Sequence, residues 1–304
     1  MKLSVCVPIY GTEKYIERCA RSLFEQGNED VEYIFVNDCT KDNSVNVLKK
    51  TIEEYPSLVS KIKIIELEKN LGLAGARLAG LQNASGDYIW CVDSDDYIEP
   101  NAVSSLLPYM NGGNDFIVFN YKILNREGIT YYKSTTLNVD NVLSNRVSPC
   151  IWKCVFKKEL CQKYNIWPVV GINNSEDYLL TSRLIFVAKS PILIDDYYLY
   201  NYNLMNENSY TNKPSLKNLQ DCVKCMLVVF DFYKKYDAIK AHHVALCYRM
   251  AICYRNLFAF SSSDVLCMKL LMKIKEVDKL LYFLLRHNVY GLSQFLKLYR
   301  KMFL

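Results

Sequence analysis

The stretch Tyr88-Ile89-Trp90-Cys91-Val92-Asp93-Ser94-Asp95-Asp96 places three carboxylates directly after an apolar run. The run has the length and the aromatic and β-branched content of a buried strand. Carboxylates crowded at the end of such a strand repel one another and resist removal from water, so folding alone does not explain them. Mg²⁺ and Mn²⁺ prefer oxygen ligands and are commonly held by one or two carboxylates together with substrate phosphates. The stretch therefore predicts a divalent-metal site, and the simpler interpretation is a solvated acidic turn.

Similar apolar runs precede and follow this stretch, at residues 3–7, 31–36, 62–67 and 116–119. They lack polar alternation, which is typical of parallel strands that are covered on both faces. Helical patterns separate them, near 13–26, 42–55, 73–84 and 100–110. This alternation predicts an α/β fold with a doubly wound, mostly parallel sheet.

Polar and aromatic residues follow three of the predicted strands directly. They are Pro8 and Tyr10, then Asn37 and Asp38, and finally the acidic stretch at 93–96. Because ligands of such sheets bind at the carboxyl ends of the strands, we expect these residues to converge on one edge.

The character of the chain changes near residue 215. Residues 1–214 hold 22 Lys and Arg against 26 Asp and Glu, whereas residues 215–304 hold 15 against 6. The second part also has long helical patterns. We therefore expect one α/β domain over 1–214 and a basic helical region over 215–304, with an anionic surface as a partner of the latter.

Histidines and cysteines exclude several kinds of chemistry. His242, His243 and His287 are the only histidines, so a base within the first 241 residues must be a carboxylate and a metal there must have oxygen ligands. The 12 cysteines are scattered through apolar segments without the spacing of a disulfide framework, which favours a reducing compartment. The pair Cys222 and Cys225 has no second pair, so it predicts neither a zinc site nor a redox site.

No signal peptide and no apolar run long enough to span a membrane occurs in the sequence. We therefore expect a cytoplasmic protein. The residues Leu292, Phe295, Leu296, Tyr299 and Phe303 repeat at helical spacing beside Lys297, Arg300 and Lys301. This pattern predicts a basic amphipathic helix, which would either dock on the inner face of the cell membrane or pack on the core or on a second copy in a homodimer.

Four signatures now give the chain a resemblance to the family 2 glycosyltransferases of the GT-A fold. They occur in the expected order, as Ser4-Val5-Cys6-Val7-Pro8-Ile9-Tyr10, Val36-Asn37-Asp38-Cys39-Thr40-Lys41-Asp42-Asn43-Ser44, Asn70-Leu71-Gly72 with Ala76-Arg77-Leu78-Ala79-Gly80, and Gly86-Asp87-Tyr88-Ile89 before the D-x-D stretch. The resemblance covers roughly residues 1–212. Two departures occur in the second signature, where Asn37 stands at a position that is often acidic and Cys39 at a frequent turn glycine.

The resemblance implies a UDP-sugar donor and a role for each matching residue. Tyr10 offers a face to the base and the main chain at Pro8 meets its edge, while Asp38 accepts from the uracil N3–H. Arg77 reaches the base or the diphosphate. Asp95 with Asp93 holds Mn²⁺ or Mg²⁺, and Asp96 supports the ribose or sugar hydroxyls.

The second half resembles the family more weakly. One segment is similar to a W-x-K type of segment, Trp152-Lys153-Cys154-Val155-Phe156-Lys157-Lys158-Glu159-Leu160. Another resembles the loop and acidic pair that supply the catalytic base, Gly171-Ile172-Asn173-Asn174-Ser175-Glu176-Asp177. By resemblance Asp177 is the base of an inverting transfer. An acidic pair favoured by the start of a helix is the alternative. Asn208-Ser209 is similar to the family's closing loop.

The sequence thus predicts a metal-dependent hexosyl- or N-acetylhexosaminyltransferase that acts on a glycan or lipid-linked acceptor in cell-surface polysaccharide synthesis, with no nucleic acid as partner. The alternative is a catalytically degenerate module that binds a nucleotide or glycan. A dinucleotide-dependent oxidoreductase is disfavoured, because Gly72-Leu73-Ala74-Gly75 lacks the full glycine pattern and does not follow the first strand. A sugar nucleotidyltransferase would need a glycine-rich basic loop after that strand, which Pro8-Ile9-Tyr10-Gly11-Thr12 does not provide.

Overall fold

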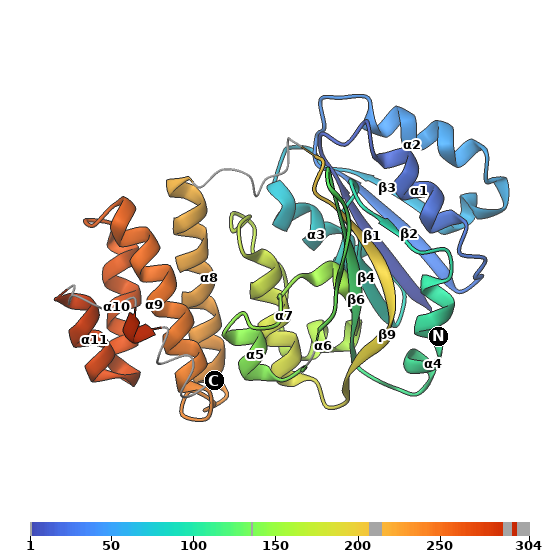
Figure 1. The fold of residues 1–304 in the computed structure, drawn as a ribbon. Helices are drawn as coiled ribbons and strands as arrows, with labels where there is room; N and C mark the ends of the chain where they lie inside the picture. Colours follow the sequence, from blue (N-terminus) through green and yellow to red (C-terminus); the bar gives the residue numbers. More distant parts are fainter. Residues whose placement is uncertain (1, 135, 207–214, 288–293, 297–304) are drawn as a thin grey trace. The chain divides into compact units, whose positions relative to one another are not determined.

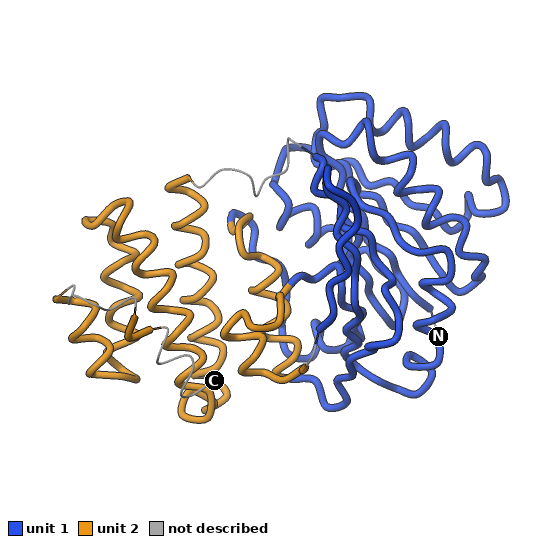
Figure 2. The backbone as a smooth tube through the Cα atoms, in the orientation of Figure 1, with its two compact units in different colours: residues 1–135, 150–171, 187–212 blue, residues 136–149, 172–186, 213–304 orange. Residues whose placement is uncertain are grey.

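The computed structural model of the chain describes residues 2–134, 136–206, 215–287 and 294–296. Contacts within the chain divide it into two compact units (Figure 2). Unit 1 comprises 1–135, 150–171 and 187–212, and unit 2 comprises 136–149, 172–186 and 213–304. Two segments that precede residue 214 thus belong to unit 2, and the domain boundary at 214 stays a prediction.

Unit 1 is built on a nine-stranded sheet with the order β3-β2-β1-β4-β8-β6-β9-β5, in which β7 pairs with β6. The strands are β1 (Leu3–Ile9), β2 (Val31–Asn37), β3 (Ile62–Glu66), β4 (Tyr88–Cys91), β5 (Tyr97–Ile98), β6 (Phe116–Asn125), β7 (Gly128–Tyr132), β8 (Cys154–Lys157) and β9 (Pro191–Asn203). β1 to β4 are parallel and β6 is parallel to β9, whereas β5, β7 and β8 run against their neighbours. The predicted mostly parallel α/β sheet is confirmed.

Helices cover both faces of the parallel strands. Figure 1 shows α1 and α2 on one side of the sheet and α3 on the other. The helices of unit 1 are α1 (Ile16–Phe24), α2 (Ser44–Glu53), α3 (Gly72–Asn83), α4 (Ala102–Asn111) and α6 (Lys158–Tyr164), with 3-10 turns at η1 (Pro56–Lys61) and η2 (Ile151–Lys153).

The sequence explains this layering, because neighbouring residues of a strand point to opposite faces. In β1, Val5 and Val7 belong to the core that includes α1 and α4. Cys6 faces the other way, toward α3, where a side chain at Gly80 would have its Cβ 3.2 Å from the Cβ of Cys6. Both faces are therefore packed, and the apolar runs show no polar alternation.

Unit 2 is helical in its described part. Its helices are α5 (Val139–Leu143), α7 (Glu176–Val187), α8 (Leu216–Lys235), α9 (His243–Phe260), α10 (Val265–Val277) and α11 (Lys279–Arg286). Side chains cap four of them, because Asn138, Ser215, Asp264 and Asp278 each accept a hydrogen bond from a backbone N–H of the following helix. None of the helices in the described ranges combines the length and apolar character that crossing a membrane requires.

Two predicted elements lie outside the described residues. They are the closing loop at Asn208-Ser209 and most of the basic amphipathic helix over 292–303, of which residues 294–296 are described as helical. The 12 cysteines are all described, and all are free thiols.

Candidate functional site

The carboxyl ends of β1, β2 and β4 meet at one edge of the sheet, as predicted. β1 pairs with both of the other strands, and Ile9 lies opposite Asn37. The backbone N–H of Asp38 donates to Ile9 O at 3.1 Å, and that of Val92 donates to Cys6 O at 3.0 Å. The structure therefore brings Pro8, Tyr10, Asp38 and the acidic stretch to the same edge.

The acidic stretch forms a tight turn between β4 and β5. The backbone N–H of Asp96 donates to Asp93 O at 3.0 Å. Residues from the end of β9 hold the turn from outside. Asn203 Nδ2 donates to Asp95 O at 3.1 Å, and the Asp93 N–H donates to the Tyr200 hydroxyl at 3.0 Å.

Asp96 lies buried beneath the turn, with 1% of its surface exposed. Its two carboxylate oxygens accept from the Tyr200 hydroxyl and from the backbone N–H of Asn203, each at 2.7 Å. Burial raises the pKa of Asp96 well above its usual range, and the charges of Asp95 and Asp93 raise it further. The contacts that the structure gives Asp96 are thus internal, and its predicted contact with the donor stays a prediction.

Tyr200 is itself held by an aromatic layer. Its ring stacks on Trp152 at a centroid distance of 4.6 Å, and Trp152 also stacks on Tyr202 at 5.2 Å. The backbone O of Trp152 accepts from the Trp90 indole N–H at 2.7 Å. The tryptophan of the predicted W-x-K segment therefore supports the residue that braces the acidic turn.

Asp93 and Asp95 are the two carboxylates that remain partly accessible in the turn. Arg77, which is 1% exposed on α3, forms an ion pair with Asp93 Oδ1 at 2.7 Å. Asp95 Oδ2 accepts from Asn206 Nδ2 at 2.8 Å. Burial raises the pKa of Asp95, and the charge of Asp93 adds to this effect. The direct contact of Arg77 with a nucleotide stays a prediction, whereas its contact with Asp93 is observed.

These two carboxylates fit a hard divalent cation. Their oxygens are the ligand type that Mg²⁺ and Mn²⁺ prefer, and a cation would relieve the charge repulsion between them. Within the described ranges, no group of three or more His, Cys, Asp or Glu side chains could hold a metal ion. A metal at Asp93 and Asp95 would therefore need further oxygen ligands from water or from a bound diphosphate.

Asp38 is 3% exposed at the end of β2. Its carboxylate accepts from the backbone N–H of Leu71 at 2.6 Å and of Gly72 at 2.8 Å, at the start of α3. Burial raises the pKa of Asp38, and these two hydrogen bonds only partly oppose the effect. Asn70 Nδ2 also donates to Asp38 O at 3.0 Å. The third signature, Asn70-Leu71-Gly72, therefore fixes the position of Asp38 in the second signature through hydrogen bonds.

The departure at Cys39 leaves the backbone turn intact. Cys39 has a φ of 56°, in the left-handed region that favours glycine. Its thiol donates to Leu67 O at 3.0 Å, which holds the side chain in place. The position therefore has the backbone conformation for which glycine is frequent in the family.

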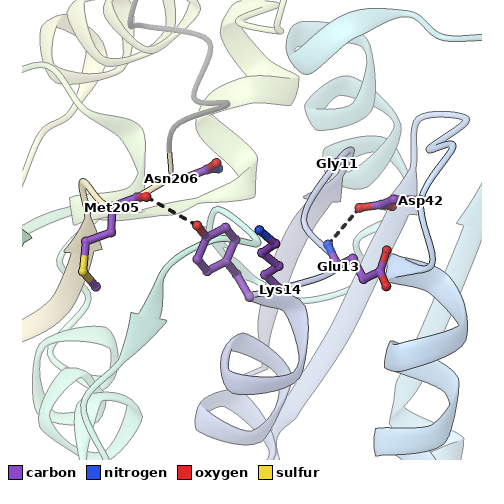
Figure 3. A pocket seen from close by; sticks show the side chains of 7 residues that line it. Gly11, Glu13, Lys14, Asp42, Met205 and Asn206 are labelled. Atoms are coloured by element: carbon purple, nitrogen blue, oxygen red, sulfur yellow. Dashed lines mark hydrogen bonds between the residues drawn. The ribbon is translucent and has the colours of Figure 1, made fainter.

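A pocket of about 580 Å³ lies at this edge of unit 1. It is lined by Gly11, Glu13, Lys14, Tyr15, Asp42, Met205 and Asn206 (Figure 3). The Tyr15 hydroxyl is 3.5 Å from Met205 O, so the start of α1 and the end of β9 approach each other across it. Asn206 joins the pocket to the acidic turn, because the same side chain donates to Asp95. Tyr10, with 54% of its surface exposed, follows β1 directly.

Asp177 and Glu176 lie in the first turn of α7, in unit 2. Glu176 is buried and Asp177 is partly exposed. The preceding Ser175 has a φ of 67°, and its hydroxyl is 3.2 Å from the Cys222 thiol of α8. The role of Asp177 as base stays a prediction.

Sequence reasoning missed the contribution of the β9 end. Tyr200, Asn203 and Asn206 make the contacts that shape the acidic turn, yet they lie outside the motifs that resemble the family. Tyr200 and Tyr202 are two residues apart in one strand, so their rings point to the same face of the sheet. This spacing was the sequence feature that could have indicated the aromatic layer.

Comparisons with known proteins agree with this geometry. Residues 4–168 match the model of the family described as glycosyl transferase family 2. A poly(ribitol-phosphate) beta-glucosyltransferase of Bacillus spizizenii is 32% identical over 209 residues, which cover 66% of this chain and 32% of that protein. The chain spans between 30% and 60% of the length of the first curated relatives that it matches.

Two solved structures share the fold. Staphylococcus aureus TarS 1-349 in complex with UDP has a TM-score of 0.70 at 21% identity, covering 94% of this chain and 87% of that chain. The mannosyltransferase PcManGT from Pyrobaculum calidifontis, solved with GDP-Man and Mn²⁺, has a TM-score of 0.57 at 17% identity, covering 99% of this chain and 82% of that chain. The likeness confirms the predicted GT-A type of α/β fold.

Proposed function

The chain belongs to glycosyl transferase family 2, and from that premise we propose that it transfers a sugar from a UDP-sugar to a hydroxyl group of a glycan or lipid-linked glycan acceptor. The observation that carries the proposal is the braced acidic turn, which presents Asp93 and Asp95 beside a pocket at the carboxyl edge of the sheet. Folding alone gives no reason to hold partly buried carboxylates so close together.

Asp93 and Asp95 would hold Mn²⁺ or Mg²⁺. Such an ion supplies positive charge that neutralises the departing nucleoside diphosphate. Arg77 fixes the orientation of Asp93 through its ion pair, and Asn206 does the same for Asp95. Mn²⁺ is present in the solved complex of the mannosyltransferase that shares the fold.

The nucleoside would lie against the ends of β1 and β2. The exposed ring of Tyr10 offers a stacking face, and the main chain at Pro8 meets the base edge. Each oxygen of the Asp38 carboxylate accepts one backbone N–H and keeps a second lone pair, which suits an added hydrogen bond from uracil N3–H. The UDP complex of TarS supports a uridine nucleotide.

Asp177 would act as the base. Its carboxylate takes the proton of the acceptor hydroxyl as that oxygen attacks the anomeric carbon from the face opposite the diphosphate, so the configuration at that carbon inverts. Its position in the first turn of a helix stabilises the ionised carboxylate that this role requires.

The basic region over 215–304 is proposed to dock on an anionic membrane surface, where a lipid-linked acceptor resides. Packing on the core or formation of a homodimer is the competing arrangement.

The proposal is tested by calorimetry and by transfer assays on the same samples. We expect UDP to bind with a strong dependence on Mn²⁺, and GDP, CMP and dTDP to bind more weakly. Asp177→Asn should keep the UDP affinity and lose transfer by about 10²- to 10⁴-fold, because it removes only the proton acceptor.

The matched control is Glu159→Gln, which neutralises an acidic residue in the first turn of α6. It should change neither binding nor transfer. A folded protein that binds none of the four nucleotides would contradict the transferase proposal and favour the degenerate binding module. An Asp177→Asn variant with full activity would exclude Asp177 as the base.

A further inference from the structure

The pocket beside the acidic turn has one cation among the residues that line it, Lys14, which lies just before α1. In Figure 3 its side chain stands between Met205 and Asn206 on one side and Glu13 and Asp42 on the other. Lys14 is exposed, and the structure pairs it with no carboxylate among the described residues. Its ammonium is therefore available to a ligand.

The two acidic residues of the pocket are engaged elsewhere. Glu13 Oε2 accepts from the backbone N–H of Asn43 at 3.0 Å. Asp42 accepts from the Thr40 hydroxyl at 2.7 Å, from the Ser44 hydroxyl at 2.6 Å and from the Glu13 N–H at 2.9 Å. Burial alone would raise the pKa of Asp42, but these hydrogen bonds lower it. Both carboxylates thus serve the start of α2, and the described structure pairs neither of them with Lys14.

Two arginines near the acidic turn have partners of their own. Arg77 is buried and paired with Asp93. Arg18 lies with its guanidinium 4.1 Å from the ring centroid of Tyr97. Lys41 and Lys69, in the loops after β2 and β3, are not among the residues that line the pocket, so Lys14 is the lining cation that can meet an anionic ligand there.

We propose that Lys14 binds the diphosphate of the nucleotide-sugar donor and stabilises the charge that develops on the leaving nucleoside diphosphate. The inference rests on the proposed function and adds a specific residue to it. Asn206 gives the spatial link, because it lines the pocket and also contacts Asp95, the proposed metal ligand. A diphosphate that shares a metal with Asp95 would therefore have Lys14 as its nearest uncommitted cation in the pocket.

The test measures the affinities of UDP and of uridine in the presence of Mn²⁺, for wild type, Lys14→Ala and Lys14→Arg. We expect Lys14→Ala to weaken UDP binding by about tenfold or more, since a hydrogen bond to a charged group is lost, and to leave uridine binding unchanged. Lys14→Arg should stay within about threefold of wild type, because it keeps the charge. Lys49→Ala, on the exposed surface of α2, is the matched control and should behave as wild type.

Two results would overturn the assignment while leaving the proposed function intact. One is an equal UDP affinity of wild type and Lys14→Ala, including the case in which only binding of a phosphate-bearing acceptor is weakened. The other is an equal loss for UDP and uridine, which would indicate general damage to the pocket. A wild type that binds neither ligand would overturn the proposed function as well, and the wild-type titration alone identifies that case.

Discussion

The two edges of the parallel sheet both hold carboxylates that are largely removed from water, but their surroundings shift the pKa values of these carboxylates in opposite directions. At the amino edge, Glu32 lies at the start of β2 and is 7% exposed. At the carboxyl edge, Asp95 and Asp96 follow β4. The pKa of Glu32 is lowered, whereas the pKa values of Asp95 and Asp96 are raised.

The amino edge is a satisfied network. Burial alone would raise the pKa of Glu32, but four hydrogen bonds, from the Ser4 hydroxyl, the Ser85 backbone and hydroxyl, and the Lys2 ammonium, lower it to about 2. Gly86 completes the network, because its N–H donates to the Ser4 hydroxyl at 2.8 Å. A Cβ at Gly86 would lie 2.7 Å from Lys2 O, so the three chain segments meet here without room for a side chain.

The carboxyl edge lacks such compensation. Asp96 has two donors, but its neighbours in the turn carry the same charge, and Arg77 is the one ion-pair partner that the described structure gives to the turn. The difference indicates that the amino edge contributes to stability, whereas the carboxyl edge retains repulsion between like charges, which the proposed bound cation would relieve.

Among the substitutions that distinguish the two edges, Asp95→Asn should change transfer the most, and it should move activity and stability in opposite directions. Transfer should fall by about 10³-fold, because the proposed metal ligand is lost. The melting temperature should stay equal or rise, because the substitution removes a buried charge that Asp93 repels. Transfer rates and thermal unfolding in the absence of metal measure the two effects.

The control for Asp95→Asn is Asp87→Asn, just before the opposite end of β4. Asp87 is exposed and accepts from the Lys2 N–H at 3.1 Å. The Asp87→Asn substitution should leave transfer unchanged. If Asp95→Asn lost as much stability as a core substitution does, the acidic turn would be required for folding, and the two edges would not differ in their roles.

The next effect concerns Glu32→Gln. Since the pKa of Glu32 falls from 4.5 to about 2 on folding, its ionisation stabilises the fold above pH 4.5, and this contribution is lost as the pH falls from 4.5 toward 2. At about 1.4 kcal/mol per tenfold change in proton affinity, ionised Glu32 contributes about 3 kcal/mol at pH 7.

Glu32→Gln should therefore lower the free energy of unfolding by about 2–3 kcal/mol at pH 7 and approach wild type near pH 2. Urea unfolding across this pH range measures it. The exposed Glu53→Gln provides the control and should show no such convergence. A Glu32→Gln curve parallel to wild type at all pH values would refute the contribution of ionisation.

The smallest effect is expected for Tyr200→Phe, which should lower both the stability of the fold and the affinity of the acidic turn for Mn²⁺. It removes the donor to Asp96 and the acceptor of the Asp93 N–H and keeps the ring on Trp152. We expect a loss of about 1–2 kcal/mol and a roughly tenfold higher Mn²⁺ concentration for half-maximal transfer.

Tyr33→Phe is the matched control, because the Tyr33 hydroxyl is also buried and donates to Leu23 O at 2.7 Å, on the core side of α1. It should lower stability to a similar extent without changing the Mn²⁺ requirement. An equal shift in both variants would mean that Tyr200 acts only through general stability.

The parallel half of the fold was predictable from local patterns. The predicted strands at 3–7, 31–36, 62–67, 88–92 and 116–119 all occur, and so do the four predicted helices up to residue 110. These elements are short-range and are packed on both faces, so apolar runs separated by helical periodicity identify them. The pairing of β8 and β9 was not predictable, because it is set by contacts far apart in the sequence.

The candidate site was predictable where a motif is contiguous and unpredictable where it is assembled from distant segments. Asp38 and Asp93–Asp96 follow strands whose order can be inferred, so their convergence could be expected. The brace from Tyr200, Asn203 and Asn206 depends on tertiary contacts, and the alternation of Tyr200 and Tyr202 indicates only that the two rings share a face. The same holds for the burial of Arg77, which a helical sequence position cannot reveal.

The brace also has a consequence for the order in which the protein is assembled. Tyr200, Asn203 and Asn206 are separated from their partners in the acidic turn by 104 to 111 residues. β1 to β4 are complete by residue 91, so the parallel core can form while the chain is still growing. At a synthesis rate of about 5–20 residues per second, Tyr200, Asn203 and Asn206 are synthesised roughly 5–20 seconds after the acidic turn that they contact. During that interval a nascent chain has the scaffold of the site before it has the side chains that orient Asp95, the proposed metal ligand.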